Sequence, residues 1–243
     1  MTIAIRPRYR AVALVEPCPC PPVMQIVFPL PWTFMQVAAF TQFMSADRIA
    51  SYVYGGADPG DDPLWRRSGA RTREEYSRWC RHACGMACLR MLLHHRDGHA
   101  PPLLDLVYGC RAYGGYREEP EGIKGLYYAP FADYARAEHG LTAEVHPLMD
   151  LGELEELLAA GRMVIASVHP EIRRPERPAP GRGGHLVLVT GAADGTVRFN
   201  NPSGHTEKSR RARLPLARFG DFFAGRGISV LAPDTRVAPE RVG

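Results

Sequence analysis

Three residues that lie far apart in the sequence carry side chains suited to acyl chemistry. Cys84 provides a thiol, His185 an imidazole and Asn201 a side-chain amide. Attack of a cysteine on a carbonyl group requires a thiolate, a nearby base and hydrogen-bond donors for the oxyanion. A histidine can take up the thiol proton, and an amide oxygen can fix the tautomer and angle of the imidazole ring. The sequence therefore predicts a cysteine nucleophile, a histidine base and an asparagine that orients the base.

Cys84 is predicted to lie where a loop meets the beginning of a buried helix. The segment from Cys84 to Leu93 is apolar on nearly all sides, which is typical of a helix in the protein interior. The free amides and the dipole at the beginning of a helix favour the thiolate of a cysteine placed there, and Gly85 leaves room for a substrate. A preceding helix should begin after Thr72, because Thr72 and Glu75 have capping-box spacing.

His185 and Asn201 fall in the part of the chain that is predicted to form a sheet. Segments rich in β-branched residues indicate strands at residues 162–168, 185–191, 196–201 and 227–233. An Asp-Gly pair between the second and third segments predicts a hairpin turn, which brings Asn200 and Asn201 back towards His185. Neighbouring strand residues point to opposite faces, so Asn201 rather than Asn200 is expected to face His185.

Turn and cap signals divide the rest of the chain. Helices are expected at residues 45–55, 130–140 and 150–161, a strand at 35–43 and a Tyr/Gly-rich loop at 108–116. Because the helices precede an antiparallel sheet, the predicted fold class is α+β. Residues 1–34 are predicted to be a tail, since their prolines cannot propagate a helix or a central strand. The predicted domain spans residues 35–235, and residues 236–243 form a second tail.

The segments HACGMACLRMLL, FTQF and GGHLVLVTG, with the partner segment AADGTVRFNNPSG, resemble the C39-like peptidases. These are papain-like cysteine peptidases that process bacteriocin precursors at double-glycine leaders. The resemblance covers about residues 36–232 and implies a papain-like α+β fold, with a buried central helix packed on an antiparallel sheet. It also implies a cysteine peptidase with Cys84 as nucleophile, His185 as base, Asn201 as orienting residue and Gln42 as oxyanion donor. No membrane-spanning stretch or phosphate-binding loop is found, so a stand-alone member is expected.

Gln42 departs from the family pattern. It lies 42 positions before Cys84, whereas the family usually places this glutamine a few residues before the cysteine, and the position six before Cys84 is Arg78. Either residues 43–78 form a long insertion at the surface, or the oxyanion hole is built from other groups. In the first case the Gln42 side-chain nitrogen should point into the cleft, close to the Cys84 sulfur.

Other interpretations of the cysteines and histidines remain open. Cys84 fits a buried structural thiol as well, and Cys80 and Cys88, one helical turn to either side, are predicted to be structural. A zinc site of Cys80, His82, Cys84 and Cys88 is the main chemical rival. That spacing matches no common zinc finger, and one continuous helix cannot surround a metal tetrahedrally. We therefore expect no metal and no cofactor. His205 is an alternative base in a polar turn.

The same three residues are compatible with more than one activity. A peptide or small amide is the expected substrate, but an amine or alcohol could intercept the acyl-enzyme and make the protein an acyltransferase. A catalytically silent peptide-binding module is the other alternative. Residues 171–184 are rich in Arg and Pro and run directly into His185. They form either a solvated connection or a stiff lid whose arginines hold an acidic group or C-terminal carboxylate of the substrate.

Composition narrows the function classes further. The formal net charge is +4, and Lys124 and Lys208 are the only lysines, so arginine supplies nearly all the positive charge. Acidic residues almost balance the basic ones, so the charge does not require a nucleic-acid partner. Three of the six cysteines are four residues apart, which is helical spacing and not a disulfide framework. We expect a cytoplasmic, thiol-reducing setting and no membrane partner.

Overall fold

The computed structural model describes residues 36–231, all of which belong to one unit, Phe34–Gly243. The predicted tails, 1–34 and 236–243, lie outside the described residues, as do Cys18 and Cys20. The predicted domain boundaries therefore stay predictions.

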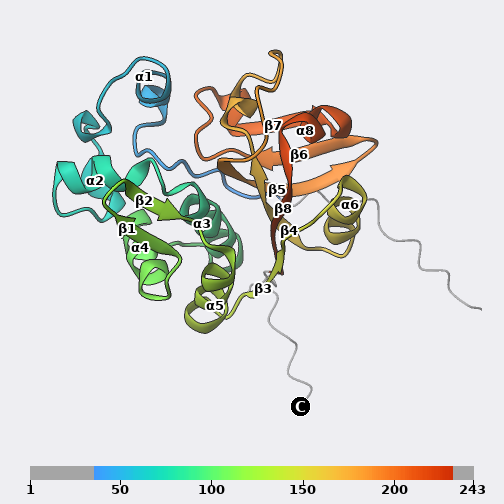
Figure 1. Ribbon diagram of the computed structural model, residues 1–243, viewed down its shortest axis with the longest axis horizontal. Coiled ribbons are helices and arrows are strands. Elements are labelled where there is room, and N and C mark those ends of the chain that lie inside the picture. The colour runs from blue at the N-terminus through green and yellow to red at the C-terminus, as the bar shows by residue number, and fades with distance from the viewer. Residues whose placement is uncertain (1–35, 232–243) are drawn as a thin grey trace, which may run out of the picture. The chain divides into compact units, whose positions relative to one another are not determined.

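A six-stranded antiparallel sheet forms the frame of this unit (Figure 1). Its strands run in the order β3-β8-β4-β5-β6-β7. Their bounds are β3 (Thr142–His146), β4 (Met163–Val168), β5 (His185–Ala193), β6 (Thr196–Asn200), β7 (Arg211–Pro215) and β8 (Phe223–Leu231). The predicted hairpin joins β5 to β6. Asp194 and Gly195 both have positive φ values, 51° and 66°, as a tight Asp-Gly turn requires.

Helices cover both faces of the sheet (Figure 1). Their bounds are α1 (Ile49–Val53), α2 (Arg73–Cys80), α3 (Cys84–Asp97), α4 (Leu103–Ala112), α5 (Tyr128–His139), α6 (Leu151–Ala159), α7 (Glu207–Arg210) and α8 (Leu216–Phe222). A separate two-stranded hairpin consists of β1 (Tyr116–Glu119) and β2 (Gly122–Gly125).

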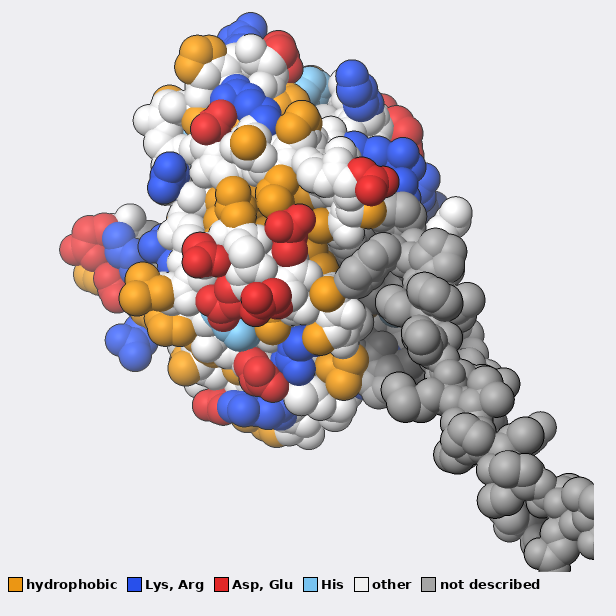
Figure 2. All heavy atoms as spheres, turned by 90° about the vertical axis from the view of Figure 1, so that its right-hand side faces the viewer, with side chains coloured by type: hydrophobic (Ala, Val, Ile, Leu, Met, Phe, Trp, Pro, Cys, Tyr) orange, Lys and Arg blue, Asp and Glu red, His pale blue; other side chains and the backbone are white. Residues whose placement is uncertain are grey.

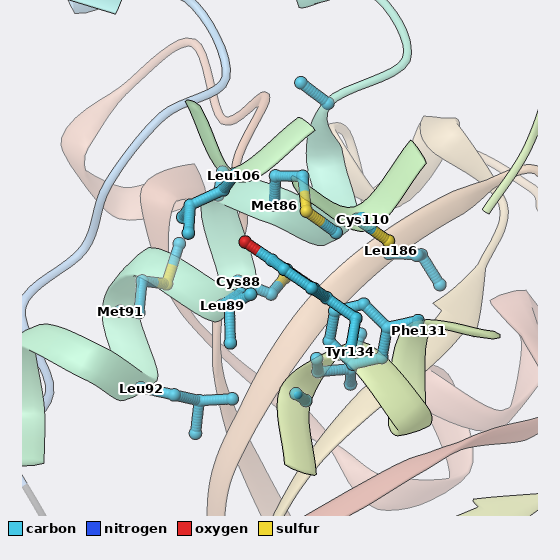
Figure 3. Packing of buried hydrophobic residues seen from close by; sticks show 14 of the residues in the cluster. Met86, Cys88, Leu89, Met91, Leu92, Leu106, Cys110, Phe131, Tyr134 and Leu186 are labelled. Atoms are coloured by element: carbon cyan, nitrogen blue, oxygen red, sulfur yellow. The ribbon is translucent and has the colours of Figure 1, made fainter. Parts of the chain in front are cut away.

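Alternate residues of the central strands face two different hydrophobic cores. On β4, Ile165 packs with α3, α4 and α5, while its neighbour Val164 packs with α6 and α8 on the other face. On β5, Leu186 and Val187 divide in the same way. Figure 3 shows the first core, where side chains of α3 lie among those of α4 and α5 and beside Leu186. The predicted α+β class, with a buried helix packed on an antiparallel sheet, is confirmed.

The local signals around α3 act as predicted. Thr72 caps α2 by accepting a hydrogen bond from the Glu75 amide at 3.1 Å, and the Glu75 carboxylate accepts a hydrogen bond from the amide of Arg71. Gly98 ends α3 in the left-handed conformation, with φ of 77°. These caps mark where α2 begins and where α3 ends.

Two predicted elements are wrong. Residues 36–43 form no strand. Their backbone groups bond instead to the end of β6 and to the loop that follows it: the Asn200 side-chain amide donates to the Val37 carbonyl at 3.0 Å, and the Gln42 amide donates to the Pro202 carbonyl at 2.9 Å. The predicted loop at 108–116 begins with the last turns of α4. Gly109 is tolerated in that helix because the ring of Tyr134 occupies the space where a Cβ would lie. The strands β3 and β7 and the β1–β2 hairpin were not predicted.

The chain between Gln42 and Cys84 has a small core of its own, formed by Phe43, Ile49, Tyr52, Trp65, Tyr76 and Cys80. Asp62, fully buried, organises this segment. Its carboxylate accepts hydrogen bonds from the Tyr76 hydroxyl and the Ser45 amide, each at 2.9 Å. Burial opposes the charge, but hydrogen bonds from Ser45, Leu64 and Tyr76 outweigh it and lower the pKa of Asp62. Residues 43–78, predicted to be an excursion on the surface, therefore form a folded subregion that returns the chain to Cys84; that they are an insertion stays a prediction.

The visible surface carries mixed charge. On the face shown in Figure 2, acidic side chains gather near the middle, with basic and hydrophobic side chains around them. Within residues 36–231, no helix is both long enough and apolar enough to cross a membrane.

Candidate functional site

Cys84 is the first residue of α3, directly after the turn that follows α2. Its side chain is only partly exposed. Burial raises the pKa of the Cys84 thiol. The backbone amides of Leu186, Gly85 and Cys84 itself, and the positive charge of Arg173, act in the opposite direction. The sulfur therefore lies among the free amides at the helix start and beside the first residues of β5, where N–H groups can stabilise negative charge.

Gly85 is required by close packing at this junction. A Cβ on Gly85 would lie 2.6 Å from a side-chain carbon of Leu126 and 3.1 Å from one of Leu186. The glycine thus lets the beginning of α3 approach β5 closely, which places Cys84 next to the strand that begins with His185. The sequence predicted this glycine for a different reason, space for a substrate.

His185 is the first residue of β5 and follows two glycines with positive φ, Gly183 at 81° and Gly184 at 94°. Its ring is almost fully buried, with 5% of the residue exposed. Burial and the positive charge of Arg173 lower the pKa of His185 to about 3, against an opposing effect of the Asn201 hydrogen bond. At neutral pH the imidazole is therefore uncharged and able to accept a proton.

Asn201 directly follows β6, and its Oδ1 lies 2.8 Å from His185 Nε2. An amide oxygen only accepts hydrogen bonds, so His185 Nε2 carries the proton and Nδ1 has the free lone pair. Asn200 points elsewhere and bonds to Val37. The prediction that Asn201 and not Asn200 faces His185 is confirmed.

Ser203 and Arg173 belong to the same cluster and were not identified from the sequence. The Ser203 hydroxyl lies 3.0 Å from His185 Nε2 and 3.2 Å from Asn201 Oδ1, and it accepts a hydrogen bond from Arg173 Nε at 2.8 Å. Ser203 is fully buried, and its amide also donates to Asn201 Oδ1, at 3.0 Å. The position of Ser203, two residues after Asn201 in a turn, was the available signal. Arg173 lies in the Arg/Pro-rich segment whose role was left open.

Cys84 and His185 line one cavity of about 230 Å³. The helix side of the cavity includes Arg81 and His82, and the sheet side includes Ser167 and Arg226. A second hollow, of about 500 Å³, lies against β5, β6 and β7, and the described residues that line it include no cysteine or histidine. The smaller cavity is therefore the candidate active site.

Gln42 is placed differently from the expectation. It is buried and absent from the residues that line the cavity, and its side-chain nitrogen donates to the carbonyls of Cys80 at 2.8 Å and Arg81 at 3.3 Å. Its backbone amide bonds to the Pro202 carbonyl at 2.9 Å. Because the side-chain nitrogen donates to two carbonyls next to the turn before Cys84, it does not point into the cavity as predicted. A direct role as oxyanion donor stays a prediction.

The rival residues lie apart from this chemistry. Cys80 and Cys88 are buried, and burial raises the pKa of each thiol. His205 does not line the cavity, and its buried Nδ1 has no hydrogen-bond partner within residues 36–231. Within residues 36–231, no group of three histidine, cysteine or acidic side chains is arranged to hold a metal ion.

Comparisons with known proteins give structural likenesses only. No protein-family model matches the chain. No curated protein is similar to it in sequence. The peptidase domain of Streptococcus ComA, a bifunctional ABC transporter of a quorum-sensing pathway, is 14% identical with a TM-score of 0.41, over 62% of this chain and 92% of that one. A double-glycine-motif protease of an AMS/PCAT transporter, solved in complex with the leader peptide, is 18% identical with a TM-score of 0.41, over 62% and 84%.

A protein from Bacillus anthracis described as a C39-like peptidase is 16% identical with a TM-score of 0.42, over 63% of this chain and 90% of that one. The function of this chain is inferred from the geometry of its own site.

Proposed function

We propose that the protein is a papain-like cysteine hydrolase that cleaves a peptide or amide bond through an acyl-enzyme on Cys84. The observation that carries this proposal is the 2.8 Å contact between Asn201 Oδ1 and His185 Nε2, at the edge of a cavity that Cys84 also lines. A buried histidine held by an amide, next to a thiol at a helix start, is the arrangement that nucleophilic catalysis by cysteine requires.

Acylation follows from the protonation states of the two groups. Since His185 Nε2 is bonded to Asn201, Nδ1 is the ring nitrogen that takes the proton of the Cys84 thiol. The sulfur forms a bond to the scissile carbonyl carbon, and the carbon–nitrogen bond breaks. The proton passes from His185 to the departing amine. Water then attacks the thioester with His185 as base, the acid leaves and the thiol is restored.

The resting pair is uncharged in this description. Burial raises the pKa of Cys84, and burial together with Arg173 lowers the pKa of His185, so neither group is ionised at neutral pH. The histidine thus acts as a general base during attack and not as the positive partner of a preformed thiolate. This distinguishes the site from one in which an ion pair exists before the substrate binds.

Backbone amides are the first candidates for the oxyanion donors. The amides of Cys84 and Gly85 lie at the beginning of α3, where no preceding turn of the helix satisfies them, and the Leu186 amide also faces the Cys84 sulfur. When the sulfur attacks the substrate, the oxyanion forms on the former carbonyl oxygen. It can accept hydrogen bonds from two of these three amides, so no side-chain donor is needed.

A chromogenic ester tests the proposal without knowledge of the natural substrate. The protein is mixed with 4-nitrophenyl acetate, and release of nitrophenolate and the mass of the acetylated protein are followed together. We expect a burst of nitrophenolate and an acetyl group on Cys84, which tandem mass spectrometry separates from Cys88. Cys84→Ser and His185→Ala should abolish the burst. Acetylation that is independent of His185 would contradict the proposed mechanism.

The fate of the acyl-enzyme separates the activities that share it. Loss of the acetyl group to water supports a hydrolase. Transfer to an added amine, faster than to water, would make the protein an acyltransferase. If no acyl-enzyme forms, a peptide-binding module without catalytic activity is the alternative that remains. We also propose a thiol-reducing compartment for the protein, because Cys84 has to stay reduced to act.

A further inference from the structure

The cavity that contains Cys84 has positive charge on two sides, and the described residues that line it include no acidic side chain. Arg81 contributes from the helix side and Arg226 from β8. Neither arginine forms an ion pair with a residue in the range 36–231; Arg81 has one long hydrogen bond, at 3.4 Å, to the Tyr52 carbonyl. A ligand with a negative charge would supply the partner that both guanidinium groups lack.

An irregularity in the sheet directs Arg226 to this place. Val168 pairs with Phe223 and Ala166 with Gly227, so a single residue of β4, Ser167, lies opposite residues 224–226 of β8. Such bulges change the direction of a side chain and are frequent next to active sites. Gly225, with φ of 64°, provides the backbone conformation that the bulge needs.

Ser167 completes a pair of donors with Arg226. The residue is 2% exposed and lines the cavity, yet its hydroxyl makes no hydrogen bond to another described residue. Both groups lie next to Gly183, since a Cβ there would be 3.1 Å from Arg226 Nη2 and 3.4 Å from Ser167 Oγ. A guanidinium and a hydroxyl on the same side of a glycine form a suitable site for a carboxylate, with one oxygen for each donor.

We propose that the substrate carries a carboxylate within a few bonds of the scissile carbonyl, and that Arg226 and Ser167 bind this carboxylate. Arg81 adds positive charge from the helix side of the cavity. The substrate class is therefore an acidic peptide or an acidic acyl compound. The carboxylate belongs either to the acyl part or to the leaving group. This inference rests on the proposed function, since it assigns the substrate of the same cavity.

Matched pairs of esters test the charge preference on each side of the scissile bond. For the acyl side, mono(4-nitrophenyl) glutarate is compared with 4-nitrophenyl pentanoate, which has a methyl group in place of the carboxylate. For the leaving-group side, 3-carboxy-4-nitrophenyl acetate is compared with 4-nitrophenyl acetate. The rate of acylation of Cys84 is measured for each ester, and the background rate of Cys84→Ser is subtracted. For each pair, the rate with the charged ester is divided by the rate with the neutral ester. This ratio is then divided by the corresponding ratio for free cysteine, which corrects for intrinsic reactivity.

We expect one of the two charged esters to acylate Cys84 about fivefold faster than its neutral partner, as for one solvent-exposed ion pair. Arg226→Gln should bring the ratio close to one, and Ser167→Ala should lower it in the same direction. Arg213→Gln on β7, which removes one positive charge outside the cavity, should leave the ratio unchanged. The preference should also weaken as salt is added.

Alkylation gives a second measurement that does not depend on turnover. Iodoacetate and iodoacetamide differ by one negative charge, and their relative rates at Cys84 should follow the same order in the same variants. Corrected ratios near one in the parent protein, for both ester pairs and for alkylation, would overturn the carboxylate site while Cys84 remained the nucleophile. Absence of acylation by every ester would instead contradict the proposed function, and the alkylation ratio would still decide the charge preference.

Discussion

Asn201 Oδ1 accepts a hydrogen bond from His185 Nε2 at 2.8 Å, while the side-chain nitrogen of the same asparagine is buried with no hydrogen-bond partner among residues 36–231. A buried unsatisfied donor costs about 1–3 kcal/mol. The fold therefore holds the Asn201 side chain in an orientation that gives His185 Nε2 a hydrogen-bond acceptor and leaves the N–H groups of Asn201 unsatisfied. That cost is easier to explain by a role in orienting His185 than by a role in stability.

Replacement of Asn201 by alanine should separate these roles. We expect Asn201→Ala to slow the acylation of Cys84 by about 10–100-fold, as for the loss of other orienting partners, under conditions in which the variant stays folded. Asn200→Ala is the matched control, because Asn200 bonds to Val37 and does not contact His185. It should lower stability and leave acylation nearly unchanged. Equal kinetics in the two variants would contradict the assignment of Asn201.

Arg173 should control the ionisation of both reacting groups. Its positive charge lowers the pKa of His185 and that of Cys84. In Arg173→Gln, both pKa values should rise, so the rate of Cys84 alkylation by iodoacetamide should increase only at higher pH than in the parent protein. Arg173→Lys keeps the charge and should keep the profile. An identical pH profile in all three proteins would show that Arg173 only supports Ser203.

The sequence was sufficient for the residues whose roles depend on local patterns. The apolar segment after Cys84, the Asp-Gly turn and the alternation along β6 together predicted the buried helix, the hairpin and the choice of Asn201 over Asn200. Ser203 and Arg173 could not be found in this way. Their roles come from contacts between the turn after β6 and the loop after β4, and neither residue belongs to a periodic pattern.

The strand predicted around Gln42 was wrong for a related reason, because a strand also depends on contacts that the local pattern does not contain. A short apolar segment predicts a strand equally well whether or not a partner strand is available. Here Val37 packs into the core that contains α3, against a face of the sheet, and the segment pairs with no described strand. The chain bends at residues 42–44, and the Gln42 amide groups bond to the turn before Cys84 and to the loop after β6.

The buried His185 should make the fold sensitive to acid. Its pKa is about 3 in the folded state and about 6.5 in an unfolded chain. Between these values the unfolded state binds a proton that the folded state does not. Stability is therefore lost as pH falls below about 6.5, by up to about 1.4 kcal/mol per pH unit from this residue. The free energy of unfolding, measured with denaturant at several pH values in this range, should depend less steeply on pH in His185→Gln than in the parent protein. An equal pH dependence in the two proteins would contradict the lowered pKa of His185.

Gln42 should act first as a tether between the two halves of the site. Its side-chain nitrogen holds the carbonyls of Cys80 and Arg81 in the turn before Cys84, and its backbone amide holds Pro202, next to Asn201. Gln42→Ala leaves two carbonyls without this donor, so we expect the free energy of unfolding to fall by about 1–3 kcal/mol. Gln36→Ala is the control, since Gln36 lines the other hollow, and it should change neither stability nor acylation.

The same variant decides whether Gln42 is also an oxyanion donor. Loss of a single donor costs about 2.7–4 kcal/mol in transition-state stabilisation, or about 10²–10³-fold in rate. If the amides of Cys84, Gly85 and Leu186 supply the oxyanion hole, acylation by Gln42→Ala should slow far less than this when measured well below its melting temperature. A full loss of that size at unchanged stability would contradict the tether. It would mean that the Gln42 nitrogen leaves the Cys80 and Arg81 carbonyls when substrate binds and reaches the oxyanion itself.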